Sequence, residues 1–301
     1  MNRLITQLTK GKNTHIVFIT PALIGLFLFL GIPFISAIIL SFTNLRLGSP
    51  LPLEFIGLEQ YYRILKDPAF LRALLNNGIF ALVIVPVQTA IALGIAILLN
   101  QPLKGMAIFR TFFFMPVVFP MSLVSVVWIL IYAPNPDGMM NSLMEFLTFG
   151  SWETTDFLRN STFALPAIML LSMWQGVGFQ MVIILAGLQS IPENLYEAAA
   201  IDGSNKINQF IYITLPQLRN TLIFVMLVTS ILAFRLFDQV KIMTEGGPNN
   251  ATTTVMYEAV KAAFEQQKMA KGAAMTVVFF LVVLSITIIQ RVVVKQERAI
   301  D

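Results

Sequence analysis

Long apolar runs constrain the fold of this chain more than any other feature. A helix needs about 20 mostly apolar residues to cross a hydrocarbon core about 30 Å thick. Six stretches are candidates, the last two being the shortest: residues 16–42, 73–99, 107–132, 162–189, 221–237 and 273–290. The sequence therefore predicts an all-α membrane protein with about six transmembrane helices.

Charged residues are scarce in the chain and almost absent from these runs. The chain is 56% hydrophobic and 12% charged, whereas soluble domains carry about 25% charged residues. Arg110 and Arg235 fall inside the runs, each near an end from which a long side chain reaches the interface. The first run is too long for a secretory signal and lacks a convincing cleavage site. We therefore expect one transmembrane domain over residues 16–301 after an N-terminal tail of residues 1–15.

The composition argues against several kinds of chemical site. Cysteine is absent and His15 is the single histidine, so disulfides, thiolate metal sites and His-based triads are not expected. The phosphate-binding pattern GxxxxGK followed by Ser or Thr is also missing, because "KGKNT" places Asn13 where that hydroxyl would hold the metal. The net charge of +4 comes from scattered basic residues, which is typical of membrane flanks rather than nucleic-acid binding. We expect no catalytic residue, metal or cofactor in this chain, with membrane lipid rather than nucleic acid around it.

The distribution of Lys and Arg gives a weak indication of orientation. Six spans place both termini on one side of the membrane. Basic residues are somewhat denser in the segments that would then share this side: residues 1–15, 100–106, 190–220 and 291–301. The positive-inside rule therefore favours cytoplasmic N- and C-termini.

One polar segment, residues 190–216, interrupts the apolar sequence between the fourth and fifth runs. Ser190 is expected to cap a helix whose first turn contains Pro192 and Glu193, residue types that suit a helix start. That helix should end at the turn "DGS", where Gly203 is free to adopt a positive φ. Ser204 should then cap a second short helix. Pro216 should begin the approach to the next span.

The segment predicts two short helices outside the bilayer that serve as a docking element. Three consecutive alanines, residues 198–200, leave a smooth helix surface that a groove of another protein could approach closely. A plain connector and a helix lying on the membrane are the alternatives. A membrane-surface helix should carry a broad apolar face with basic residues opposite, whereas Leu195 and Tyr196 stand almost alone here.

The segment resembles the signature of the membrane subunits of bacterial ABC importers. That signature is Glu-Ala-Ala, three residues, Gly, nine residues and Ile-x-Leu-Pro, and the matching positions are Glu197, Ala198, Ala199, Gly203, Ile213, Leu215 and Pro216. The resemblance implies that these residues, with Asp202, form coupling helices that sit in a cleft of a separate ATPase subunit. ATP and Mg would then be bound by that partner.

Three further stretches look like the carbohydrate-uptake branch, and specifically its maltose-type first permease: residues 112–120, 184–203 and 237–260. Ser204 departs from the alanine common in that family, and the large extracytoplasmic domain of the maltose permease itself is missing. The resemblance implies a permease of the bacterial inner membrane that moves a sugar or oligosaccharide. Its implied partners are a second homologous permease, an ATPase dimer and an extracytoplasmic solute-binding protein. ATP-driven dimerisation of the ATPases would flip the permeases from inward-facing to outward-facing.

Candidate substrate contacts follow from sugar chemistry, because pyranose faces stack on aromatic rings and buried hydroxyls need polar partners. The candidates are Asn77, Gln88, Trp128, Trp174, Gln175, Gln180, Arg235 and Asp238, with Asn76 and Tyr132 beside them. Interfacial belts are an alternative for the membrane aromatics. A structural ion pair is an alternative for Arg235 with Asp238. "EGGPNN", residues 245–250, is interpreted as an outer turn that contacts the binding protein.

Other functions stay open at this point. A glycerol phosphate ester or a polyamine could replace the sugar, although a phosphate favours several basic contacts and Arg235 alone qualifies. A stand-alone secondary carrier should have acids within its spans for ion coupling, and the six runs contain none. A membrane enzyme would lack catalytic His, Cys and clustered carboxylates.

Overall fold

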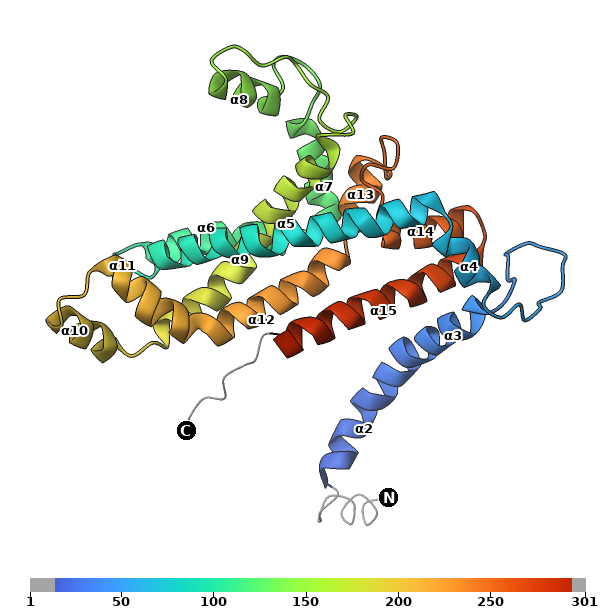
Figure 1. Cartoon of the computed structure of the whole chain (residues 1–301), viewed down its shortest axis with the longest axis horizontal. Coiled ribbons are helices and arrows are strands. Elements are labelled where there is room, and N and C mark those ends of the chain that lie inside the picture. Colours follow the sequence, from blue (N-terminus) through green and yellow to red (C-terminus); the bar gives the residue numbers. More distant parts are fainter. Residues whose placement is uncertain (1–13, 294–301) are drawn as a thin grey trace. The chain divides into compact units, whose positions relative to one another are not determined.

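Helices supply the regular structure of this chain in residues 14–293, the range that the computed structural model describes, with one isolated β-bridge between Thr43 and Phe55. In chain order, with η for a π-helix, the elements are α2 (Thr14–Leu26), η1 (Phe27–Gly31), α3 (Ile32–Ser41), α4 (Glu59–Leu65), α5 (Pro68–Leu99), α6 (Met106–Val118), α7 (Met121–Ile131), α8 (Met139–Leu147), α9 (Ala164–Gln189), α10 (Glu193–Ile201), α11 (Lys206–Gln209), η2 (Phe210–Thr214), α12 (Leu215–Phe234), α13 (Asp238–Met243), α14 (Val255–Val260), η3 (Lys261–Glu265) and α15 (Met269–Val293). Figure 1 shows their order along the chain. The predicted all-α fold is confirmed.

The chain forms two compact units. The first contains the residues up to Lys66 together with Ala259–Phe279, and the second contains Asp67–Glu258 together with the residues from Phe280 onward. Most of the predicted tail lies outside the described residues, and its position 14 already begins α2. The single domain expected over residues 16–301 stays a prediction.

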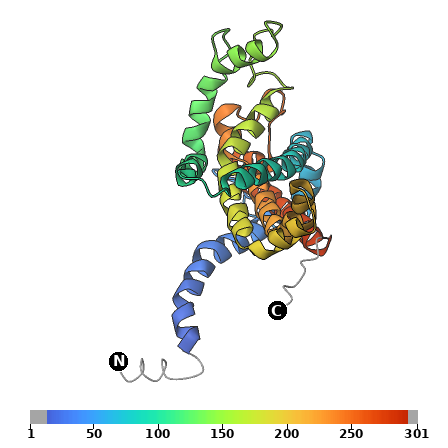
Figure 2. The same cartoon turned by 90° about the vertical axis from the view of Figure 1, so that its left-hand side faces the viewer.

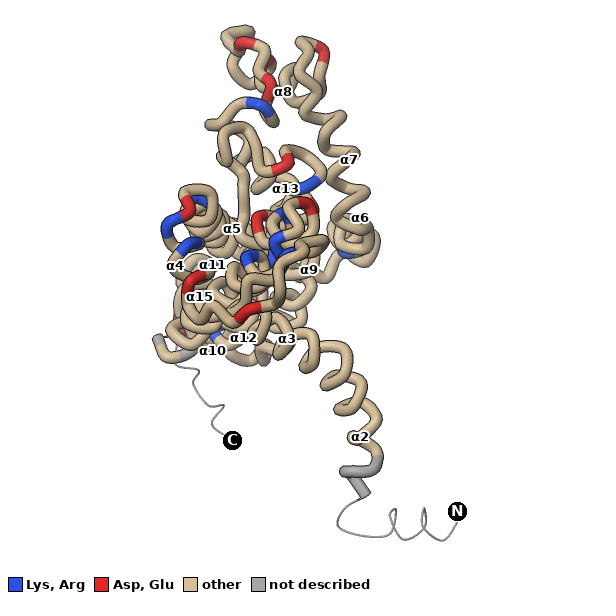
Figure 3. Tube along the Cα trace, turned by 90° about the vertical axis from the view of Figure 1, so that its right-hand side faces the viewer, with Lys and Arg blue, Asp and Glu red and all other residues tan. Residues whose placement is uncertain are grey.

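Within residues 14–293, five helical stretches are long and apolar enough to cross a membrane: Phe18–Ser41, Pro68–Leu99, Ala164–Gln189, Lys206–Met243 and Met269–Gln290. They match the predicted first, second, fourth, fifth and sixth spans, although the fifth begins well before residue 221. Charged residues gather at helix ends and in loops, and the long helices are mostly free of them (Figure 3). This is the distribution that a hydrocarbon surrounding requires.

The third predicted span, residues 107–132, is not one straight helix. It consists of α6 and α7, which are bent by 99° relative to each other. The break lies at Phe119, whose extended backbone has φ −79° and ψ 138°, and at Pro120, the N-cap of α7. A proline ring clashes with a helical conformation at the preceding residue, so Pro120 ends α6.

Hydrogen bonds within the first unit determine how many times the broken pair crosses the membrane. The Leu47 amide donates to the Gln267 carbonyl (2.9 Å) and the Ala270 amide donates to the Leu45 carbonyl (3.1 Å). Both segments therefore lie on one side of the membrane, and an even number of crossings separates them. Helices α5, α9 and α12 make three crossings, so α6 and α7 together make the fourth. Counted in this way, the described residues contain six candidate spans, in agreement with the prediction.

Two of the π-helices precede a proline by the same distance. η1 ends two residues before Pro33, and η2 ends two residues before Pro216. In a regular α-helix, a proline ring clashes with the carbonyl four residues earlier. The π turn shifts that carbonyl, so the long helix continues through the proline position. Both the first and the fifth spans gain their length in this way.

The core of the second unit lies where α5, α9 and α12 pack together. Its buried cluster consists of Ala92, Ala96, Leu99, Val177, Met181, Ile184, Leu185, Leu188, Leu218 and Val225. Two glycines of α9 allow neighbouring helices to approach closely, as small residues do in membranes. A Cβ at Gly178 would lie 2.1 Å from the Phe113 carbonyl oxygen of α6, and one at Gly187 would lie 2.9 Å from side-chain atoms of Leu218 and Thr221 on α12. Figure 2 gives a second view of this packing.

Candidate functional site

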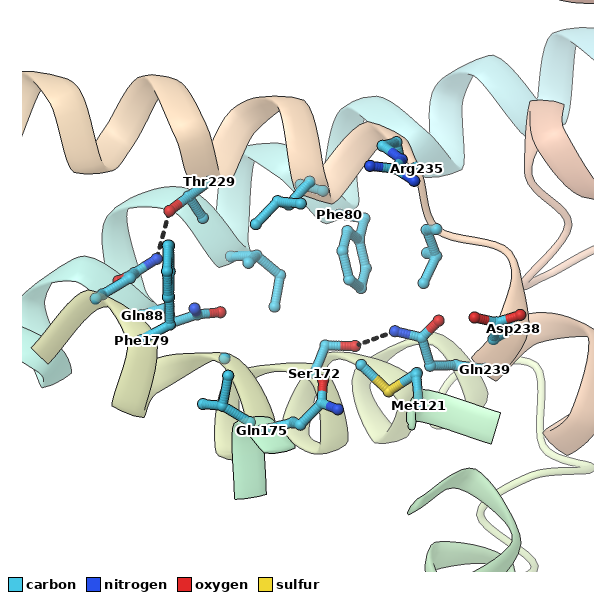
Figure 4. A pocket seen from close by; sticks show the side chains of 17 residues that line it. Phe80, Gln88, Met121, Ser172, Gln175, Phe179, Thr229, Arg235, Asp238 and Gln239 are labelled. Atoms are coloured by element: carbon cyan, nitrogen blue, oxygen red, sulfur yellow. Dashed lines mark hydrogen bonds between the residues drawn. The ribbon is translucent and has the colours of Figure 1, made fainter. Parts of the chain in front are cut away.

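A cavity of about 420 Å³ lies inside the second unit, among α5, α6, α7, α9, α12 and α13. Five of the predicted substrate residues line it: Gln88, Gln175, Gln180, Arg235 and Asp238. The sequence interpretation missed the other lining residues, among them Phe80, Ser172, Phe179, Thr229 and Gln239. Figure 4 shows the labelled members of both groups around one space. The cavity therefore combines carboxamides, hydroxyls, two phenyl rings and one charge of each sign.

Hydrogen bonds hold three of the carboxamides in place. The Gln180 side chain, which is buried, donates through Nε2 to the Thr229 hydroxyl. Gln239 Nε2 donates to the Ser172 hydroxyl over 3.2 Å. Both bonds appear as dashed lines in Figure 4. Gln180 Oε1 has no hydrogen-bond partner among the described residues, and a buried acceptor without a partner is costly. Gln180 therefore carries an unsatisfied acceptor that is buried in the wall of the cavity.

Gln175 links the cavity to the break in the third span. Its Nε2 donates to the Phe119 carbonyl over 3.0 Å. This carbonyl ends α6 immediately before Pro120, and no helical amide reaches it at that position. One carboxamide therefore both lines the cavity and fixes the bend between α6 and α7.

The two charges of the cavity are not paired with each other. Arg235 follows the last residue of α12 and Asp238 begins α13, and both side chains are exposed. Salt bridges within residues 14–293 join Arg63 to Glu59 and Arg159 to Asp156, and neither involves Arg235 or Asp238. The structural ion pair that we considered for Arg235 and Asp238 does not form here. Both charges are open to a solute.

The predicted tryptophans lie outside the cavity lining. Trp128 is buried, and its ring centroid is 5.7 Å from that of Trp174 and 5.5 Å from that of Tyr132. The Tyr132 hydroxyl donates to the Ala167 carbonyl over 3.0 Å, and its ring packs 5.6 Å from that of Phe157. These rings form a structural cluster, and the aromatic faces in the cavity belong to Phe80 and Phe179.

Asn77 anchors a loop instead of facing the cavity. The side chain is fully buried, its Oδ1 accepts from the Val255 amide (2.9 Å), and its Nδ2 donates to the Phe234 carbonyl (3.5 Å). Its neighbour Asn76 donates to the Thr253 carbonyl (2.9 Å). Both asparagines therefore fix the chain between α13 and α14.

A pattern in the sequence could have located the missed residues. Ser172, Gln175, Gly176 and Phe179 follow the spacing i, i+3, i+4, i+7, which places them on one face of α9. Phe80, Ile84 and Gln88 recur every four residues along α5 in the same way. Such faces carry both apolar and polar members, so a search for polar residues alone overlooked the phenyl rings.

The polar segment forms a second candidate site, with the predicted helix but different caps. α10 begins after Pro192, and the Ser190 hydroxyl instead donates to the Gly187 carbonyl at the end of α9. Asn205, not Ser204, caps α11 and accepts from the Asn208 amide over 2.8 Å. The expectations for Ser190 and Ser204 were therefore wrong, because the end of α9 engages the first hydroxyl and Asn205 is the residue next to the helix. Gly203 has the predicted positive φ, +78°.

The second short helix is not a separate element. α11, η2 and α12 follow one another without a break. Ile213 consequently lies in the π turn, and Leu215 and Pro216 begin α12. The fifth span thus starts within the motif, because the π turn accommodates Pro216.

α10 is attached to this helix through one tyrosine. The Tyr196 hydroxyl shares a 2.9 Å hydrogen bond with the Thr214 hydroxyl, and Gln209 Nε2 donates to the Tyr196 carbonyl over 3.4 Å. The rest of α10 is largely open: Glu197, Ala198, Asp202 and Gly203 are exposed and Ala199 is half-buried. The apolar side chains of Ile201, Ile207 and Tyr212 are 87%, 68% and 75% exposed. The segment therefore presents an acidic and apolar surface, which is the composition of a docking site.

Comparisons with known proteins agree with this arrangement. Residues 67–299 match the family described as binding-protein-dependent transport system inner membrane component. The chain is 33% identical over 286 residues to the probable ABC transporter permease protein YurN of Bacillus subtilis, covering 94% of this chain and 97% of that protein. It is 30% identical over 291 residues to the arabinooligosaccharides transport system permease protein AraP of Halalkalibacterium halodurans, covering 96% and 90%.

A solved structure has a similar fold. It is the crystal structure of a bacterial ABC transporter involved in the import of the acidic polysaccharide alginate, and one chain of it superposes with a TM-score of 0.81. The superposition covers 97% of this chain and 98% of that chain at 17% identity.

Proposed function

We propose a specific task for this chain, which belongs to the family of binding-protein-dependent transport system inner membrane components. It is the permease subunit of an ABC importer and translocates a sugar or oligosaccharide across the bacterial inner membrane. Separate ATPase subunits, which bind ATP and Mg, drive the transport. A second homologous permease and an extracytoplasmic solute-binding protein complete the complex.

The chemistry of the 420 Å³ cavity carries the substrate assignment. Carbohydrates need many hydrogen-bond partners together with flat apolar faces. Gln88, Gln175, Gln180 and Gln239 provide carboxamides, and Phe80 and Phe179 provide aromatic faces. The Gln175 side chain, which is half-buried, is suited to hydrogen bond with a sugar hydroxyl.

A single cation makes the non-sugar alternatives weaker. Phosphate recognition commonly uses several Arg or Lys contacts, and Arg235 is the one basic residue that lines the cavity among the described residues. A polyamine would need several acids, and Asp238 is the one acidic residue in the lining described here. An importer of a glycerol phosphate ester or a polyamine is therefore the second candidate function. A stand-alone carrier is the third.

The exposed surface around α10 supports the coupling assignment. Movement of a partner ATPase would be transmitted through α10 and its Tyr196–Thr214 hydrogen bond to η2 and the fifth span. This assignment gives functional roles to Glu197, Ala198, Ala199, Asp202 and Gly203. It places residues 190–216 on the cytoplasmic side, with both termini; the ends of the chain lie outside the described residues.

Copurification from the native cells tests the proposal. A tagged wild-type chain is purified in mild detergent, and its partners are identified by mass spectrometry. Glu197→Lys reverses one charge on the exposed part of α10. Lys104→Glu is the matched control, because it reverses an exposed charge on the same side of the membrane outside the segment. We expect an ATPase and a second permease with the wild-type chain and the control, and loss of the ATPase with Glu197→Lys.

The opposite results are equally informative. If the wild-type chain purifies alone and still transports, the importer assignment fails and a stand-alone carrier replaces it. If both charge reversals keep the ATPase, the docking role of α10 is wrong. The solute is identified separately, by mass spectrometry of the ligand that is released from the purified solute-binding protein. A ligand without sugar rings would refute the substrate assignment.

A further inference from the structure

A small basic pocket lies in the first unit and shares no lining residue with the permease cavity. Its volume is about 180 Å³, and its lining contains Leu45, Arg46, Gln60, Arg63, Lys268 and Lys271. Four of these six residues are basic, and none of those in the described lining is acidic. Water occupies about 30 Å³ per molecule in the liquid, so the pocket holds roughly a phosphate group with its adjoining ester carbons.

The fold of the first unit builds this pocket from distant parts of the sequence. Backbone hydrogen bonds join Leu47 to Gln267 and Ala270 to Leu45, which brings Arg46 close to Lys268. Gln60, which is buried, donates through Nε2 to the Thr43 carbonyl and thereby positions α4. The position of the cations thus follows from tertiary hydrogen bonds rather than from a basic run in the sequence.

Two of the pocket cations make hydrogen bonds to side chains outside the lining. Arg63 pairs with Glu59, and Lys268 Nζ donates to the neutral Gln266 side chain (3.3 Å). Like charges gathered in one pocket repel one another, and an anion with several acceptor oxygens relieves that repulsion through charge-assisted hydrogen bonds. The lining therefore selects an anion, and the fork-shaped guanidinium groups of Arg46 and Arg63 suit phosphate oxygens.

The surroundings of the pocket place that anion at the membrane surface. The pocket follows the end of the first span in the chain and adjoins the start of the last. Side chains on the connecting loop are strongly exposed and apolar: Leu51 (71%), Leu53 (60%) and Phe55 (79%). Apolar side chains beside cations are the combination that binds the interface of an anionic bilayer.

We propose that this pocket binds the phosphate group of an anionic membrane lipid. A lipid headgroup and a free phosphate both offer such an anion. We favour the lipid because the pocket lies beside the ends of two membrane spans. The lipid would hold α3, α4 and the start of α15 together at the membrane surface. This inference is independent of the transported solute.

Native mass spectrometry of the purified complex tests the inference. The probe is phosphatidylglycerol, with phosphatidylcholine of the same acyl chains as a control lipid and inorganic phosphate as a competitor. The double variant Arg46→Gln, Lys268→Gln removes two pocket cations. Lys66→Gln, Arg72→Gln is the matched control, because it removes two exposed charges outside the lining, around the start of the next span. Each cation near an anionic lipid contributes about a fivefold change in affinity.

We expect the complex to retain phosphatidylglycerol in preference to phosphatidylcholine. The pocket variant should bind phosphatidylglycerol about 25-fold more weakly than the wild type, whereas the control variant should change little. Equal binding by the two variants, or no preference between the lipids, overturns the proposal. Binding of inorganic phosphate without phosphatidylglycerol also overturns it in favour of a free anion. Unchanged thermal unfolding of the pocket variant is needed to attribute a loss of lipid to the pocket itself.

Discussion

The close approach of α6 to α9 makes Gly178→Ala the most discriminating perturbation of this structure. The added Cβ would lie 2.1 Å from the Phe113 carbonyl oxygen and 3.0 Å from the Phe113 carbonyl carbon. Ordinary contact begins at 3.4 Å, so α6 must move by about 1.3 Å, the difference between 3.4 and 2.1 Å. The Phe113 carbonyl group belongs to the backbone, so no change of side-chain rotamer relieves the clash with the added Cβ.

Whether Gly178→Ala stabilises or destabilises the protein shows whether helix packing or helix propensity dominates at this position. Alanine is favoured over glycine within a helix by about 1 kcal/mol, whereas forced overpacking costs about 1–3 kcal/mol. Gly94→Ala is the matched control, because Gly94 also lies inside a long helix and a Cβ there meets nothing within 4 Å. We expect Gly94→Ala to be neutral or stabilising and Gly178→Ala to destabilise.

Thermal unfolding of the two variants in the same detergent gives the measurement. Gly178→Ala should lower the apparent Tm by the order of 5 °C relative to Gly94→Ala. Uptake should also fall, because a shift of α6 moves Val117 in the cavity lining and the Phe119 carbonyl away from Gln175 Nε2, now 3.0 Å away. A Gly178→Ala protein that melts no lower than the control would refute the close contact between α6 and α9.

Three further substitutions test the two sites. Gly203→Val forces a β-branched residue to φ +78°, a conformation that costs about 1–2 kcal/mol, so uptake should become uncoupled from ATP hydrolysis; normal uptake would contradict the coupling role. Gln175→Ala should raise the half-saturation concentration for uptake several-fold while the complex stays assembled, and an unchanged value would remove this residue from the substrate contacts. Asn77→Ala should leave that concentration unchanged but destabilise by about 1–3 kcal/mol, because it strands the buried Val255 amide; a shift in half-saturation without a lower Tm would show that we misassigned Asn77.

Local sequence properties were sufficient to predict the apolar spans and the turn at Gly203 in the polar segment, residues 190–216. A chain in lipid must satisfy its backbone hydrogen bonds within each segment, so a long apolar run already implies a helix. The positive φ of Gly203 was predictable for a similar reason, since a glycine after a helix suits that conformation. The helix caps were harder to predict because neighbouring side chains compete for the same backbone groups. The Ser190 hydroxyl bonds to the last turn of α9, and Asn205 caps α11.

The third and fifth spans show where local rules needed context. Pro120 and Pro216 both lie near the beginning of an apolar helix, yet the chain bends by 99° at the first and runs straight through the second. The difference is the backbone before each proline: Phe119 is extended, whereas a π turn precedes Pro216. A proline in the sequence predicts an irregular helix. The surrounding packing determines whether the helix breaks or continues through a π turn.

Residue types along single helices determined that this is a multi-pass membrane protein with a polar segment between its fourth and fifth spans. The cavity was decided by tertiary structure. Trp174 and Gln175 are adjacent in sequence, yet one ring packs on Trp128 and the other side chain lines the cavity. Asn77 and Gln88 share α5, yet the first anchors a loop and the second faces the cavity. The physical reason is that hydropathy measures the transfer of each residue into lipid, whereas the face that a polar side chain shows depends on how α5, α9 and α12 cross.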